Sequence, residues 1–67
     1  MDPTLLPEIE AFLERHSMRP TTFGRGFNND VHFVRQLREG RRVWPETAAK
    51  ARAFMAARNA ALVEQAA

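Results

Sequence analysis

Proline and glycine divide this chain into short segments, and within each segment the apolar residues recur at the spacing of an α-helix. They cluster at three places: Arg19-Pro20, Gly24 to Gly26, and Gly40 to Pro45. Proline lacks the amide donor of a helix interior, and glycine adopts backbone angles that end a helix. No segment shows the alternation or the β-branched content of a strand. The pattern therefore predicts an all-α fold of four helices, with a fifth if the last one breaks.

The expected helices cover residues 5–16, 20–27, 31–39 and 46–65. In the second, Phe23 and Phe27 are four residues apart and therefore share one helix face. The fourth, if continuous, would be about 30 Å long, which exceeds what a domain of this size needs to cover. We expect a small bundle of four to five helices.

The chain is short and has no cysteine. Its 67 residues indicate a single domain, 1–67, because a chain of this length buries only about 60% of the surface that it exposes when unfolded. Disulfides and cysteine-based zinc or redox sites are excluded. No basic segment precedes an apolar run, and no stretch approaches the ~18 apolar residues of a membrane span. We expect a cytoplasmic protein without a membrane partner.

Charge is separated along the sequence. The first fourteen residues carry four acids and no base, whereas residues 15–58 carry all ten Lys and Arg side chains against three acids. This one-sided charge favours a polyanionic partner, with nucleic acid first and an acidic protein surface or anionic membrane second. Arginines that only solvate helix faces would give the same count, so charge alone leaves both interpretations open.

The two middle helices match the spacing of a helix-turn-helix. In that arrangement an apolar anchor is followed by a small residue, an apolar residue one turn on, a turn residue, and two apolar residues of the next helix. With Phe23 as the anchor, the chain supplies Gly24, Phe27, Asn28, Val34 and Leu37. Closely crossing helices need the small residue, which would explain a glycine that costs about 1 kcal/mol inside a helix. We predict a helix-turn-helix at about residues 20–40.

A recognition-helix end, a glycine, a basic pair and a proline-led helix follow one another in Val34-Arg35-Gln36-Leu37-Arg38-Glu39-Gly40-Arg41-Arg42 and then Pro45-Glu46-Thr47. At these residues the chain resembles the Cro and phage-repressor type of helix-turn-helix domain, the Xre-like family. The resemblance runs from about Pro20 to Met55, and segment 5–16 fits the family's N-terminal helix. It implies a lambda-repressor-like fold and a sequence-specific DNA-binding transcriptional regulator.

The resemblance further implies that helix 31–39 enters the major groove of double-stranded DNA. The base-contacting residues would be Val31, His32, Arg35 and Gln36. Arg35 can pair with guanine and Gln36 with adenine, each through two hydrogen bonds. Phosphate contacts would come from the positive end of the second helix and from arginines around the motif. These residues are Thr21, Thr22, Arg25, Arg38, Arg41 and Arg42.

A homodimer is also implied, because one recognition helix reads few base pairs. We expect Leu62 and Val63, near the end of the long last helix, to form the dimer surface; a frayed terminus is the alternative for this end. An alternative function is an adaptor that keeps the helix-turn-helix as a scaffold and binds a protein partner, as antitoxins, phage packaging subunits and components of the transcription machinery can do.

Catalysis, a metal ion and a cofactor are not expected. Ser17 beside His16 is sequence adjacency only, and two histidines without a carboxylate pattern give no metal site. His16 instead fits the edge of the core. Trp44 is expected to cover the bundle as a lid, and Phe33 fits either the core or a contact with a thymine methyl group. Arg38 fits either a phosphate contact or a solvated charge at the end of its helix.

Overall fold

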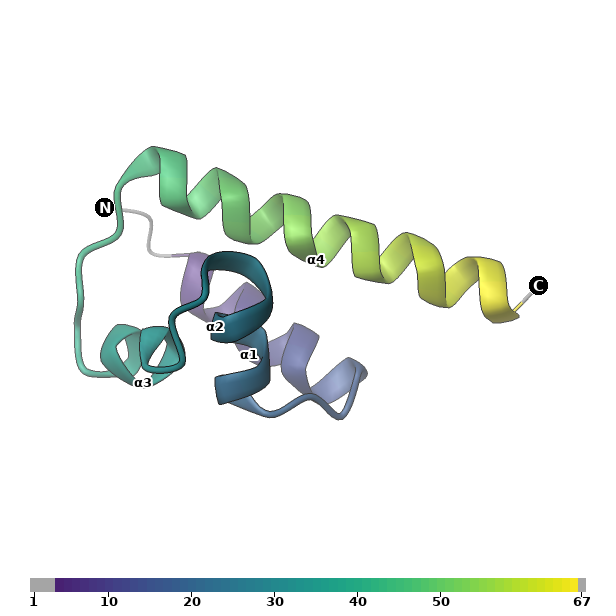
Figure 1. Cartoon of the computed structure of the whole chain (residues 1–67), viewed down its shortest axis with the longest axis horizontal. Coiled ribbons are helices and arrows are strands. Elements are labelled where there is room, and N and C mark those ends of the chain that lie inside the picture. Colours follow the sequence, from purple (N-terminus) through teal and green to yellow (C-terminus); the bar gives the residue numbers. More distant parts are fainter. Residues whose placement is uncertain (1–3, 67) are drawn as a thin grey trace.

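The computed structural model describes residues 4–66, with side chains for residues 4–62. Over this range the chain forms four helices and no strand: α1 (Leu5–Arg15), α2 (Pro20–Asn28), α3 (Phe33–Arg38) and α4 (Pro45–Ala66) (Figure 1). The predicted all-α class is confirmed, and because α4 is unbroken, the described bundle has four helices rather than five. None of these four helices combines the length and apolar character needed to cross a membrane.

Local sequence sets several helix ends. α2 begins at Pro20, whose missing N–H does no harm in the first turn of a helix. It is followed by Asn29 in the left-handed conformation, at φ 51° and ψ 39°, which asparagine tolerates better than most residues. Gly40, after α3, has φ 101°. α4 begins at Pro45, one residue before the predicted start, because proline also serves as a first helical residue.

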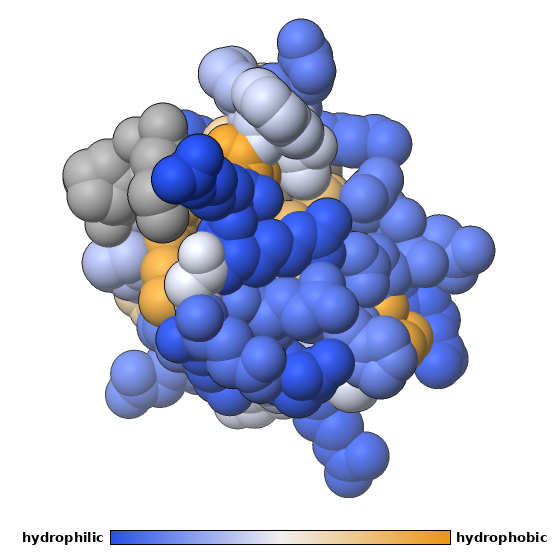
Figure 2. Space-filling model, turned by 90° about the vertical axis from the view of Figure 1, so that its left-hand side faces the viewer, coloured by the Kyte–Doolittle hydropathy of each residue, from blue (hydrophilic) through white to orange (hydrophobic). Residues whose placement is uncertain are grey.

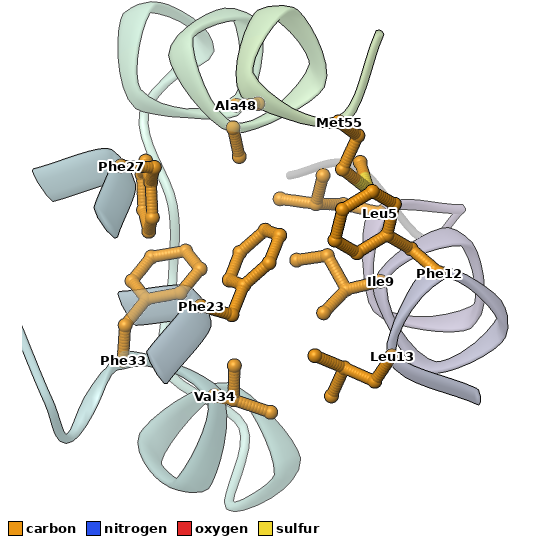
Figure 3. Close-up of a cluster of buried hydrophobic side chains, with 11 residues drawn as sticks. Leu5, Ile9, Phe12, Leu13, Phe23, Phe27, Phe33, Val34, Ala48 and Met55 are labelled. Carbon is orange, nitrogen blue, oxygen red and sulfur yellow. The ribbon is translucent and has the colours of Figure 1, made fainter. Parts of the chain in front are cut away.

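Phe23 lies at the centre of a core of eleven buried hydrophobic side chains (Figure 3). Its ring centroid is 5.6 Å from that of Phe12 in α1 and 5.3 Å from that of Phe54 in α4. Each such pair contributes about 0.5–1.5 kcal/mol beyond area burial. Phe33 of α3 is fully buried in the same core, 4.7 Å from Phe27 between ring centroids. Of its two predicted positions, Phe33 therefore occupies the core, and a thymine contact is excluded.

α4 covers the other helices with its first half and extends past them with its second half (Figure 1). Its buried contacts come from two alanines, Ala48 and Ala51, and from Met55. Further along α4, a hydrogen bond joins it to His16, the residue that follows α1, with Nε2 of His16 2.7 Å from Oδ1 of Asn59. His16 is half-buried there, which confirms its predicted place at the edge of the core.

Candidate nucleic-acid interface

Gly24 lets the backbone of the turn between α2 and α3 approach α2 closely. A Cβ atom at this position would lie 1.9 Å from the backbone oxygen of Asp30 and 3.4 Å from Cβ of Phe33. Gly26 has a milder constraint, since a Cβ there would meet only the ring of Phe54, at 3.0 Å. Of these two glycines, only Gly24 faces a backbone atom that leaves no room for a side chain. It stands at the position where the helix-turn-helix spacing predicts a small residue.

Two backbone hydrogen bonds close the turn after α2. The amide of Asn29 donates to the carbonyl oxygen of Arg25 and the amide of Asp30 donates to that of Gly24, both at 3.0 Å. The left-handed residue is Asn29, whereas the predicted turn residue, Asn28, is the last residue of α2. The predicted turn is thus one residue early, because either asparagine can adopt the left-handed conformation and only the hydrogen bonds decide between them.

Asp30 links this turn to the segment that follows α3. One carboxylate oxygen accepts the backbone N–H of His32 at 3.1 Å, and the other accepts Nη1 of Arg41 at 2.9 Å. The same nitrogen of Arg41 donates to Oε1 of Gln36 at 2.8 Å, and the guanidinium lies 5.2 Å from the ring centroid of Phe33. The hydrogen bond from Arg41 lowers the pKa of Asp30 below its ordinary value of 3.8, although desolvation opposes this shift. Arg41 therefore links the segment after α3 to the turn before it.

The expected recognition helix is shorter than predicted. α3 covers Phe33–Arg38 rather than residues 31–39. Val31 and His32 lie in the turn before α3. The amide of His32 donates to the Asp30 carboxylate, and it is the amide of the next residue, Phe33, that donates to the backbone oxygen of Asp30. His32 is exposed and Val31 is half-buried.

Arg35 and Gln36, the two predicted base readers within α3, have different surroundings. Arg35 is exposed, and its Nη1 lies 2.9 Å from Oε2 of Glu39, one helical turn along. An exposed pair of this kind is worth about 0.3–0.5 kcal/mol, so the guanidinium can exchange it for another acceptor at little cost. Gln36 is half-buried, and its side-chain oxygen is already used by Arg41. Arg35 is therefore the more available of the two.

Five of the six predicted phosphate-contacting residues are exposed: Thr21, Thr22, Arg25, Arg38 and Arg42. The two threonines lie in the first turn of α2, where the helix dipole is positive. Among the side chains of residues 4–62, Arg25 and Arg42 have no ion-pair partner. Both therefore present an uncompensated positive charge to solvent.

Arg38, also a predicted phosphate contact, joins α3 to α1. Its Nε and Nη2 donate to the two carboxylate oxygens of Glu10 at 2.8 and 2.7 Å. These hydrogen bonds lower the pKa of Glu10 below its ordinary 4.5 and raise the pKa of Arg38. The Arg38–Glu10 pair accounts for part of the charge separation in the sequence, because an acid from the first fourteen residues neutralises one of the bases that follow them.

Trp44 does not cover the bundle, so this expectation was wrong: its side chain is 76% exposed, while Val43 packs against the core. Residues 41–44 have no regular secondary structure. The residue before a proline favours extended backbone angles, in which adjacent side chains point to opposite sides. The burial of Val43 thus turns Trp44 outward. No pattern in the sequence distinguishes these two adjacent apolar residues.

The two predicted interfaces lie in different parts of the molecule. α3, the segment 41–44 and the start of α4 share one end, and the far end of α4 points the other way (Figure 1). Viewed face-on, the first of these ends is mostly hydrophilic with small hydrophobic areas (Figure 2). Of the predicted dimer residues, Leu62 is half-buried on the distal part of α4, and the side chain of Val63 lies outside the described residues.

The described residues contain no group of three or more His, Asp or Glu side chains placed to hold a metal ion. Comparison with known proteins found no matching family model, curated protein or solved structure. The functional conclusion is therefore argued from the geometry and charge of the α2–α3 unit.

Proposed function

We propose that this chain is a sequence-specific DNA-binding regulator that places α3 and the preceding turn in the major groove. The observation that carries the proposal is the division of α3 into two faces. Phe33 and Val34 are fully buried in the core, with Phe33 against Phe27 of α2, and Arg35 is exposed. A helix held this way by its neighbour can enter a groove without losing its core contacts.

The proposed base contacts are led by Arg35, which would exchange Glu39 for the two acceptors of guanine. His32, in the turn before α3, would contact a base or a phosphate. Thr21, Thr22, Arg25 and Arg42 would contact the phosphate backbone, which positions the protein without reading sequence. Arg38 and Arg41, already bonded to carboxylates, would hold α3 in place.

Binding to duplexes selected from a random pool, measured over a salt series, tests this proposal. Arg35→Ala should weaken binding to the selected duplex about 5- to 100-fold and binding to unrelated duplexes much less. Arg25→Ala should weaken both and lower the salt slope by about one. Arg15→Ala on α1, also exposed and unpaired within residues 4–62, is the matched control and should change little. No binding at low salt, or full specificity after Arg35→Ala, would overturn the proposal and favour the adaptor function.

The regulator would act as a homodimer through the distal part of α4, because one six-residue α3 reads few base pairs. The position of this segment supports the dimer, since it extends past the bundle and leaves Ala60 and Ala61 exposed. Two copies would then read half-sites about one DNA turn apart. A monomeric mass in sedimentation, at concentrations above those used for DNA binding, would exclude the dimer.

A further inference from the structure

Trp44 is the one aromatic residue of this chain that the fold leaves in solvent. All five phenylalanines contribute to the core or pack against it, whereas the Trp44 side chain is 76% exposed. A single exposed apolar residue is common and needs no explanation by itself. Here, however, its orientation is fixed from both sides, because Val43 packs against the core and Pro45 begins α4. These two neighbours therefore keep the indole of Trp44 in solvent.

Trp44 shares a surface hollow with a basic residue, Arg42, whereas Glu46, two residues after Trp44, does not line that hollow. The segment 40–45 contains two arginines and no acid. Arg41 is neutralised by Asp30, but the exposed Arg42, two residues before Trp44, has no ion-pair partner among the side chains of residues 4–62. Residues 42–45 also border an open hollow of about 500 Å³. An indole beside an unpaired guanidinium is complementary to a partner that offers a flat apolar surface together with negative charge.

Trp44 and Arg42 lie near α3, the proposed recognition helix. Trp44 is six positions after Arg38, the end of α3, so the two Cα atoms lie at most about 22 Å apart. α3 and the connector occupy the same end of the molecule (Figures 1 and 2). The major groove is about 12 Å wide, so a group at this distance from α3 can reach the backbone that forms the groove wall.

We propose that Trp44 and Arg42 form a second DNA contact, in which the indole packs on a deoxyribose of the groove wall and Arg42 binds an adjacent phosphate. This inference rests on the proposed function and adds a specific contact to it. Nucleic acid is favoured over a protein partner because the charge beside the indole is unpaired and positive. The contact is independent of base sequence, so it adds affinity rather than specificity.

The chain contains a single tryptophan, so its fluorescence reports this contact directly. The test titrates the selected duplex into the full chain and follows three signals: Trp44 emission, quenching of that emission by acrylamide, and the anisotropy of a dye on the duplex. Binding should change the emission and protect it from acrylamide at least twofold, with the same midpoint as the anisotropy. An unrelated duplex, at low salt, should give the same protection once bound.

Variants separate a direct contact from a structural role. Trp44→Ala should weaken binding to selected and unrelated duplexes by the same factor, about 5- to 20-fold, a range suggested by the energies of base–aromatic stacking. Trp44→Phe should restore most of this loss. Arg42→Ala should weaken both and lower the salt slope by about one. Circular dichroism of each variant should match that of the unmodified chain.

Two outcomes overturn the contact while leaving the proposed function intact. In the first, anisotropy reports specific binding, but Trp44 emission and acrylamide access stay unchanged. In the second, the emission shifts with protein concentration in the absence of DNA, which would place Trp44 between two copies of the chain. If no duplex binds at low salt, the proposed function itself fails and the contact fails with it.

Discussion

The two connections that flank α3 are built in opposite ways. Between α2 and α3, the backbone of Asp30 presses on Gly24, and the Asp30 carboxylate is bonded on both oxygens. Between α3 and α4, a Cβ added to Gly40 would meet nothing within 4 Å, and Trp44 is exposed. The first connection is packed tightly along its backbone, whereas the second is held by the side chains of Arg41 and Val43 and leaves Gly40 and Trp44 unpacked. The proposed DNA contact would need both, because α3 has to be held at a fixed angle while other side chains stay available to the partner.

Gly24→Ala should produce the largest effect, since the new methyl would overlap a backbone oxygen that belongs to the turn itself. We expect a loss of about 3 kcal/mol or more in the free energy of unfolding, enough to unfold a domain of this size in part of the population. Urea denaturation followed by circular dichroism measures it.

Gly26→Ala is the matched control within the same helix. The added methyl meets only the ring of Phe54, which can shift, and alanine favours helix by about 1 kcal/mol. Its net effect should therefore be small. Equal destabilisation by the two substitutions would mean that the close backbone approach at Gly24 does not set the first connection apart.

Gly40→Ala tests the second connection in the same way and should cost less. The residue has φ 101°, so alanine would be strained by about 1–2 kcal/mol without any clash. Thermal unfolding would show a lower midpoint with an unchanged helical signal. A loss as large as that of Gly24→Ala would show that packing fixes both connections.

Sequence patterns predicted the first connection better than the second. The spacing from Phe23 to Leu37 identified Gly24 as a position that needs a small residue, although the backbone that approaches it is that of Asp30 in the turn rather than that of a crossing helix. The predicted start of the recognition helix, residue 31, is two residues before the observed start at Phe33. Val31 fits the apolar pattern of the helix, but the Asp30 side chain accepts the amide of His32 and keeps both residues in the turn. A side-chain hydrogen bond of this kind has no periodicity, so only the structure reveals it.

Side chains without periodic neighbours were harder still. Trp44 was predicted inside because large apolar residues are usually buried, yet the choice between it and Val43 depends on how the connector leaves α3. The pairing of Arg41 with Asp30 and of Arg38 with Glu10 joins residues 11 and 28 positions apart. Charge counts alone cannot show which of the ten bases are already neutralised.

Asp30→Asn should weaken the first connection moderately, by about 1 kcal/mol at neutral pH, because the charged hydrogen bond to Arg41 becomes a neutral one. The pKa of Asp30 is lowered in the folded state. Its contribution is therefore fully present above its unfolded pKa of about 3.8, and it is lost as the pH falls through the lower folded pKa. Acid titration of stability measures this.

Between about pH 5 and pH 2, Asp30→Asn should lose less unfolding free energy than the unmodified chain. The difference in stability between the two proteins should therefore become smaller toward acid. Glu10→Gln is the reference, since its pKa is lowered in the same direction by a more exposed pair. A difference that stays the same at low pH would indicate that the loss comes from the shape of the asparagine side chain rather than from the charge of the Asp30 carboxylate.

Trp44→Ala should change stability least, within about 0.5 kcal/mol, because the side chain makes few contacts to lose. Phe33→Ala, which removes a fully buried ring at the start of α3, should by contrast cost about 3–5 kcal/mol. The two aromatics lie at opposite ends of the same short helix and its connector, so chemical denaturation of both variants compares the connections directly. A large loss on Trp44→Ala would mean that the indole itself packs against the fold, and Trp44 would then be a structural residue. A loss near zero leaves the indole free to serve a partner.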